Sequence, residues 1–131
     1  MTKLLYVCLA LTLMAFQCKK NDAGSGTELT GKWKMVEYWV SPGTIDLTRH
    51  PAPSDNLYVT FSANSGFSSN IDKWGYDQFR SYHLIDHQQM NLIKSGMTDK
   101  VKAFYTLGKD TLTISVFGCV EGCGEVFVRV K

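Results

Sequence analysis

The chain has 131 residues with 14 basic and 12 acidic side chains, which is enough for one domain and gives a formal net charge of only +2. This near-balance excludes the strongly basic surface with which proteins bind nucleic acid, and it excludes a polybasic patch for anionic membranes. Residues 29–131 contain no second linker and no repeat of fixed period, so we expect them to form one domain.

The first 17 residues have the layout of a lipoprotein signal peptide. Lys3 is followed by uncharged, mostly apolar residues from Leu4 to Phe16, and Cys18 stands at the cleavage point. The apolar run is too short to cross a bilayer, which needs about 20 residues. We therefore expect removal of residues 1–17 and attachment of lipid to Cys18, which predicts an outer-membrane lipoprotein of the cell envelope, on its periplasmic or its surface side.

Two other interpretations of this segment remain open. A plain secretory signal is one, because lipoprotein signals usually have a small residue directly before the cysteine, where this chain has Gln17. A cytoplasmic protein with a buried apolar N-terminal helix is the other, although no polar residues alternate along Leu4–Phe16 to give an exposed helix face. After Cys18, small and polar residues predict a flexible tether over residues 18–28.

From Leu29 onward, apolar and polar residues alternate with the period of β-strands. Predicted strands cover residues 33–39, 57–62, 79–85, 90–93, 101–105, 111–117 and 126–130, with a weak one at 65–70. About eight strands in hairpin order predict an all-β fold, namely a small antiparallel up-and-down β-barrel. The interior of such a barrel is filled by side chains or holds one small ligand. Residues 71–80 fit a loop, a helical turn or a strand. Residues 41–56, with all 3 prolines, predict a long loop over an open end.

Three stretches of the domain resemble the lipocalins, and in particular the small lipocalin-like lipoproteins of the Bacteroidetes. They are Leu29–Trp33 with its Gly-x-Trp pattern, Gly108–Ile114, and the Cys119–Cys123 hairpin that Phe127 and Arg129 follow. The resemblance covers about residues 29–131 and implies a closed barrel end at Gly31 and Trp33, with Arg129 packed across the indole ring. Such a cation–π contact is worth about 0.5–2 kcal/mol. Alternatively, Trp33 is an ordinary apolar strand residue, and Arg129 is a strand residue whose side chain is solvated.

Cys119 and Cys123 are the two cysteines that remain when Cys8 is removed with the signal and Cys18 carries lipid. An oxidising compartment and a predicted hairpin tip favour a disulfide between them, with Gly122 in the positive-φ conformation that such a loop often needs. A redox or metal pair is the alternative, although reactive pairs more often have Cys-x-x-Cys spacing.

No pattern in the chain predicts catalysis, a cofactor or a metal site. His83 and His87 would lie about 13 Å apart on one strand, too far to share a zinc ion with bonds of about 2 Å. The chain has no Gly-x-Ser-x-Gly pattern and no glycine-rich phosphate loop. We therefore expect a binding protein and not an enzyme.

The candidate ligand-binding residues lie at the predicted open end of the barrel. Trp39, Trp74 and Tyr76 are the aromatic candidates. Glu37 alternates in step with the apolar residues around it, so its carboxylate is a candidate for a side chain that points into the barrel. A buried carboxylate would need a partner such as Arg80 or a ligand cation. The alternative is a bend of the strand that exposes Glu37.

These observations favour a lipid-anchored barrel that binds a small apolar or amphipathic ligand. The alternative is a protein-binding module with a filled barrel, such as an envelope inhibitor or a subunit of a surface complex, that acts through loops such as 41–56. An empty apolar interior of about 300 Å³ or more would favour the ligand, and a filled interior would favour the partner.

Overall fold

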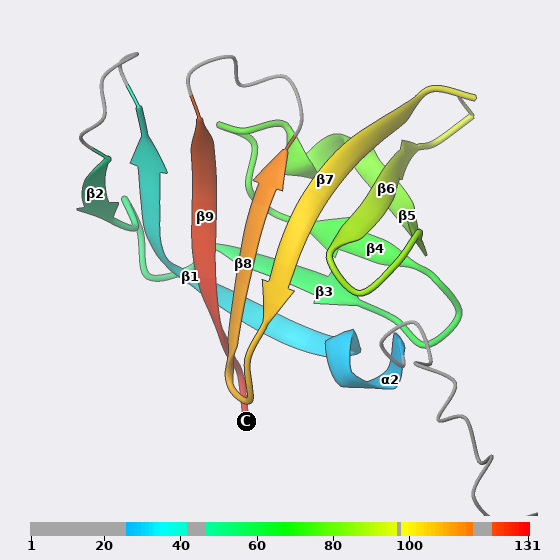
Figure 1. Cartoon of the computed structure of the whole chain (residues 1–131), viewed down its shortest axis with the longest axis horizontal. Coiled ribbons are helices and arrows are strands. Elements are labelled where there is room, and N and C mark those ends of the chain that lie inside the picture. Colours follow the sequence, from blue (N-terminus) through cyan, green and yellow to red (C-terminus); the bar gives the residue numbers. More distant parts are fainter. Residues whose placement is uncertain (1–25, 42–46, 97, 117–121) are drawn as a thin grey trace, which may run out of the picture.

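The computed structural model describes residues 26–41, 47–96, 98–116 and 122–131. These residues form nine strands, one short helix and one 3-10 turn (Figure 1). The elements in chain order are α2 (Gly26–Leu29), β1 (Gly31–Val40), β2 (Thr48–Pro51), β3 (Tyr58–Phe61), β4 (Phe67–Ser69), η1 (Tyr76–Gln78), β5 (Phe79–Leu84), β6 (Gln89–Lys94), β7 (Lys100–Leu107), β8 (Thr111–Val116) and β9 (Cys123–Arg129).

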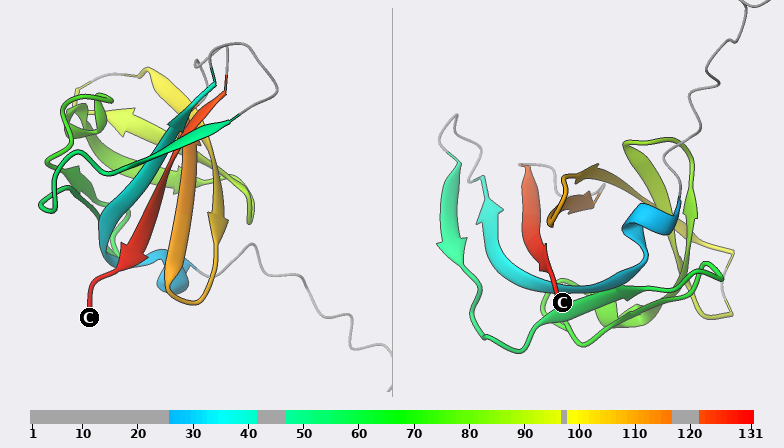
Figure 2. Two further views of the ribbon diagram at one scale, coloured as in Figure 1. Left: turned by 90° about the vertical axis from the view of Figure 1, so that its left-hand side faces the viewer. Right: turned by 90° about the horizontal axis from the view of Figure 1, so that it is seen from below.

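All nine strands belong to one antiparallel sheet that curls into a nearly closed barrel (Figure 2). The strand order is β4-β3-β1-β9-β8-β7-β6-β5, and β2 pairs with the second half of β1. The two ends of this order meet where Gly66 bridges to Ser81 and the Tyr82 N–H donates to the Ser65 carbonyl at 2.9 Å. The predicted all-β, up-and-down antiparallel barrel is therefore confirmed.

Strand β2 lies within residues 41–56, which the sequence predicted to be a loop without strands. All four of its residues are exposed, so no apolar alternation marks this strand in the sequence. Pro51 is tolerated because β2 pairs on one side only, with β1, in the part of the chain that the structure describes. The prediction was therefore wrong for residues 48–51, which extend the sheet beside β1 (Figure 1).

A bulge in β1 changes which of its side chains face the interior. The register of β1 with β9 shifts between Met35 and Glu37. Before the shift, Trp33 and Met35 are fully buried, and after it Tyr38 packs against the core. A bulge bends its strand and increases its twist. Figure 2 shows the bend of β1, which lets its first half pair with β3 and its second half with β2.

Packed apolar side chains occupy the interior of the barrel. Phe61 makes edge-on contacts with Phe67 and Tyr82, with ring centroids 5.1 and 5.0 Å apart, a geometry that aromatic pairs favour. The buried apolar residues form one cluster: Leu29, Trp33, Met35, Val59, Phe61, Phe67, Ile71, Tyr76, Phe79, Tyr82, Met90, Leu92, Ala103, Tyr105, Leu112, Ile114 and Phe127. The main core thus lies inside the barrel, and candidate sites are found at its two ends.

Candidate functional site

At one end of the barrel, Trp33 and Arg129 hold α2 in place. The indole Nε1–H of the buried Trp33 donates to the carbonyl of Leu29 at 2.9 Å. The guanidinium carbon of Arg129 lies 4.1 Å from the Trp33 ring centroid, and its nitrogens donate to the carbonyls of Thr30, at 3.0 Å, and Glu28. The packing of Arg129 on Trp33 that the resemblance implied is therefore present, and it also anchors the helix.

Gly31 permits this close approach. Its φ is +135°, where residues with a side chain are strained, and a Cβ at this position would lie 3.1 Å from a guanidinium nitrogen of Arg129. Residues 26–28, which the sequence assigned to a flexible tether, belong to α2. Arg129 thus satisfies backbone carbonyls on both sides of the predicted domain boundary at Leu29.

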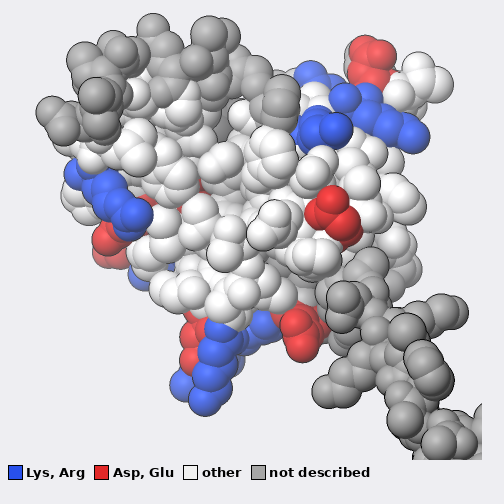
Figure 3. Space-filling view, viewed as in Figure 1, with Lys and Arg blue, Asp and Glu red and all other residues white. Residues whose placement is uncertain are grey.

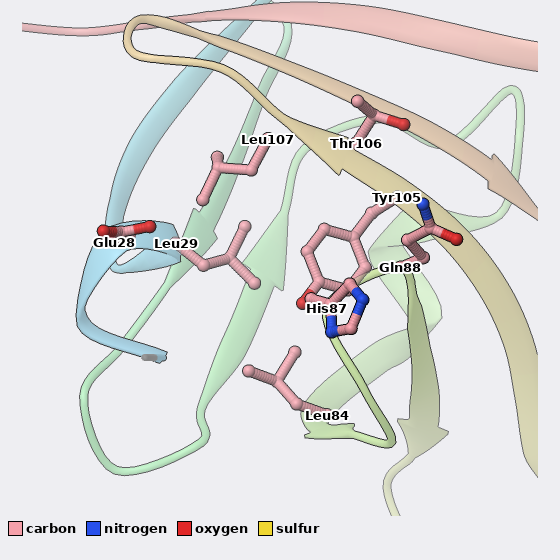
Figure 4. A pocket seen from close by; sticks show the side chains of 8 residues that line it. All are labelled: Glu28, Leu29, Leu84, His87, Gln88, Tyr105, Thr106 and Leu107. Atoms are coloured by element: carbon pink, nitrogen blue, oxygen red, sulfur yellow. The ribbon is translucent and has the colours of Figure 1, made fainter. Parts of the chain in front are cut away.

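A pocket of about 270 Å³ lies between α2, the β5–β6 turn and the end of β7 (Figure 4). Its lining residues are Glu28, Leu29, Leu84, His87, Gln88, Tyr105, Thr106 and Leu107. Leu29, Leu84 and Leu107 come from three different elements and surround a common space beside the ring of Tyr105 (Figure 4). This end of the barrel therefore offers a small, partly apolar pocket with polar groups at its edge.

The β5–β6 turn fixes the polar side of this pocket. The Asp86 carboxylate accepts from the backbone N–H groups of Gln88 and Gln89, both at 2.7 Å, and the Tyr105 hydroxyl donates to the Asp86 carbonyl at 2.9 Å. Burial, and then the charge of Asp86, raise the pKa of Tyr105, so its hydroxyl remains a neutral donor. His87 and Gln88 are exposed and lie where a polar ligand group would meet solvent.

The histidines occupy the places that the sequence predicted, with His83 in β5 and His87 in the following turn. The position of His87 beside a pocket was not predicted, because the pocket lies between α2 and the β5–β6 turn, which are more than fifty residues apart in the sequence. Among the described residues, no group of three or more His, Cys, Asp or Glu side chains could hold a metal ion.

The opposite end of the barrel is covered by the chain between β4 and β5. Ile71 and Tyr76 from this segment are fully buried, and the Tyr76 hydroxyl donates to the Glu125 carboxylate at 2.6 Å. Trp74 reaches the second half of β1, where its ring centroid lies 5.1 Å from that of Tyr38. The structure thus brings the candidates Trp74 and Tyr76 to this end, with Tyr76 packed into the interior.

Glu125 is the buried carboxyl group in the part of the chain that the structure describes, and the sequence did not predict it. It is 3% exposed, and burial raises its pKa from 4.5 to about 7, although the hydrogen bond from Tyr76 offsets part of this rise. Burial, and then the charge and hydrogen bond of Glu125, raise the pKa of Tyr76 well above its ordinary value. Glu125 shares strand parity with the buried Phe127, and that signal could have identified it.

Glu37 and Trp39 lie on the outer face of β1, so the inward position considered for Glu37 is wrong, and Trp39, a candidate for the open end, does not line the interior. The bulge before Glu37 reverses the parity of the strand. The Glu37 carboxylate pairs with Arg49 at 3.2 Å while 45% of its side chain is exposed. Arg80, the suggested partner of Glu37, donates to backbone carbonyls instead. The strand bend, which was the alternative interpretation, is the one present.

Trp39 instead covers Gly124 on the neighbouring strand. A Cβ at Gly124 would lie 2.2 Å from the Trp39 Cζ2 and 2.7 Å from the Ser115 Oγ. We therefore expect Gly124→Ala to lower the free energy of unfolding by about 1–3 kcal/mol, because the indole must move. In a Trp39→Ala background the same change should cost clearly less, as measured by a double-mutant cycle in urea. Additive effects of the two substitutions would contradict this packing.

The cysteine predictions fall mostly outside the described residues. Cys18 and Cys119 lie outside them, and Cys123 begins β9. Gly122 has a φ of +79°, the positive value that was predicted for it. The lipid attachment and the Cys119–Cys123 disulfide therefore stay predictions. No helix within the described ranges is long and apolar enough to cross a membrane.

The fold and its two ends define the chain as a small all-β protein with a nearly closed antiparallel barrel. Comparison with protein-family models, curated proteins and solved structures gives no match.

Proposed function

We propose that this protein is a lipid-anchored, lipocalin-like protein of the cell envelope whose barrel binds a small amphipathic ligand without catalysing a reaction. Packed side chains fill the barrel interior, which the sequence analysis took to favour a protein partner, so the observation that carries the proposal is instead the pocket of about 270 Å³ at the barrel end beside α2. Its volume is just below the range of about 300–1,000 Å³ that is typical of small-molecule sites, so the ligand should be small.

The lining of the pocket supports an amphipathic ligand. Leu29, Leu84 and Leu107 provide apolar contacts for an alkyl chain. His87 and Gln88 are exposed beside them and offer hydrogen bonds to a polar end. The proposed site thus lies at the Trp33 end of the barrel, whereas the sequence suggested the opposite end.

Octanoate and 1-octanol are suitable probes because they share an alkyl chain and differ in charge. We expect saturable binding of at least one of them, measured by calorimetry, and about tenfold or greater loss of affinity in Leu107→Trp, whose larger side chain would fill the pocket. Leu84→Phe is a second variant with the same expectation. Leu47→Trp is the control, because Leu47 is 56% exposed and lies outside the pocket. Equal loss in the control, or no binding of either probe, would refute the proposal.

The proposed anchor rests on the sequence of residues 1–18. Mass spectrometry of the protein isolated from its native membrane should find an acylated Cys18 at the mature N-terminus. A free N-terminus at another residue would contradict the anchor without affecting the pocket.

A protein-binding module is the second candidate, and the outer face of β8 and β9 favours it. The outward residues Thr113, Ser115, Val126 and Val128 carry no charge, and Figure 3 shows an uncharged surface over these strands. Solvated faces of antiparallel sheets usually carry polar side chains and exposed apolar patches are typical of interaction sites, so the outward Val126 and Val128 are the residues that favour a partner. Cross-linking from Thr113→Cys in envelope preparations, with exposed Ser68→Cys as the control position, should capture one defined partner if this candidate is correct.

A further inference from the structure

Four side chains form a cluster at the barrel end opposite α2, which we call the rim cluster: Tyr38, His50, Lys73 and Trp74. The ring of Tyr38 stacks on His50 with centroids 5.2 Å apart and lies tilted at 56° to Trp74 with centroids 5.1 Å apart. Tyr38 and Trp74 are half-buried, whereas His50 and Lys73 are exposed. Two tilted aromatic rings thus form a corner at the surface.

This corner already holds a cation from the same chain. The Lys73 ammonium lies 5.4 Å from the Tyr38 ring centroid and 5.1 Å from that of Trp74. These distances are within the limit of about 6 Å for a cation–π contact. Because Lys73 is exposed and flexible, its ammonium is the kind of group that a ligand cation could replace.

A buried carboxyl group, which is ionised only above its raised pKa of about 7, belongs to Glu125 at the same end of the barrel. Tyr38 is the register partner of Glu125 across β1 and β9, so the two side chains project from the same face of the sheet. Trp74 is two residues from Tyr76, whose hydroxyl is bound to the Glu125 carboxylate. Among the described residues, the hydrogen-bond partner of Glu125 is the phenol of Tyr76 and its register partner is Tyr38, and neither is a cation.

We infer that the rim cluster is a binding site for a small organic cation, such as a quaternary or primary ammonium compound, held by Tyr38 and Trp74 with Glu125 as the counter-charge. Aromatic corners of this kind recognise ammonium groups through the negative faces of the rings. The site is distinct from the pocket beside α2, and Lys73 occupies it in the absence of ligand.

Choline and its neutral isostere 3,3-dimethyl-1-butanol are the probes that separate charge from shape. We expect choline to bind in the millimolar range by calorimetry or Trp fluorescence, about tenfold more tightly than the isostere. Lys73→Met should strengthen choline binding several-fold, because the competing ammonium is gone while the alkyl stem remains. Equal affinity for the two probes in this variant, or no choline binding to it, would overturn the inference.

Matched variants distinguish the site from general effects on folding. Trp74→Leu should weaken choline binding about tenfold. Trp39→Leu, which changes the outward tryptophan, should not. At pH 8, above the pKa of about 7 of the Glu125 carboxyl, Glu125→Gln should also weaken it, whereas Glu37→Gln should not, because Glu37 lies on the outer face. Leu107→Trp should leave choline binding unchanged, so the proposals for the pocket and for the rim cluster can be refuted independently. Equal effects within either pair would overturn the inference.

Discussion

The wild-type protein is expected to lose about 3 kcal/mol of stability as the pH rises, and replacement of Glu125 by Gln should remove most of this loss. Burial raises the pKa of the Glu125 carboxyl from 4.5 to about 7, so the folded protein keeps its proton over a range in which the unfolded chain loses it. The free energy of unfolding therefore falls as the pH rises from about 4.5 to about 7, and the contribution is lost above that value. The Gln variant has no carboxyl to ionise and should lack this fall.

The difference between the two unfolding free energies, measured in urea from pH 5 to pH 8, isolates this group from others that titrate in the same range. The groups that face Glu125 are the phenols of Tyr76 and Tyr38, and the side chains beyond them are Lys73 and His50. Glu37→Gln is the matched control, because it removes an exposed carboxylate from the outer face. Parallel curves for the wild type and Glu125→Gln would contradict a buried, neutral Glu125.

Loss of the Arg129 side chain is expected to destabilise the protein by about 2–3 kcal/mol and to abolish binding in the pocket. The estimate combines a half-buried cation–π contact with Trp33 and hydrogen bonds from a charged group to the carbonyls of Glu28 and Thr30. Without them α2 loses its anchor, and α2 contributes Glu28 and Leu29 to the pocket wall. Urea unfolding and octanoate calorimetry on Arg129→Ala, at a temperature where it stays folded, measure both effects.

Arg129→Lys separates charge from geometry. Lysine keeps the positive charge but cannot stack a planar group on Trp33 while reaching two carbonyls, so it should recover less than half of the lost stability. If Arg129 were an ordinary solvated strand residue, its replacement by alanine would change the stability by no more than about 0.5 kcal/mol. That result, with unchanged ligand binding, would contradict the role of Arg129 at this end of the barrel.

The strands and the barrel could be predicted because alternation is a local property. Residues such as Leu112 and Ile114 alternate with polar neighbours, and both are fully buried in β8. β2 has no buried residue and therefore left no such pattern. The contact between Trp33 and Arg129 was expected from the resemblance, since spacing along the chain cannot pair residues that lie almost a hundred positions apart.

The carboxylate in the barrel was predicted at the wrong position for a physical reason. Parity assigned Glu37 to the interior, but one extra residue in β1 reversed the parity from that point onward. The same parity rule, applied to β9 through Phe127, identifies Glu125 correctly. Bulges depend on how two strands fit together, so the sequence of one strand does not reveal them.

The most direct test of the pocket as a binding site is an NMR titration of octanoate, and separately of 1-octanol, into protein with labelled leucine methyl groups. If the pocket binds the alkyl chain, the methyl signals of Leu29, Leu84 and Leu107 should shift together with one saturation curve. The signals of Leu57, which lies outside the pocket lining, should stay in place. No saturable shift of the three pocket leucines, or larger shifts at Leu57, would contradict binding at this site.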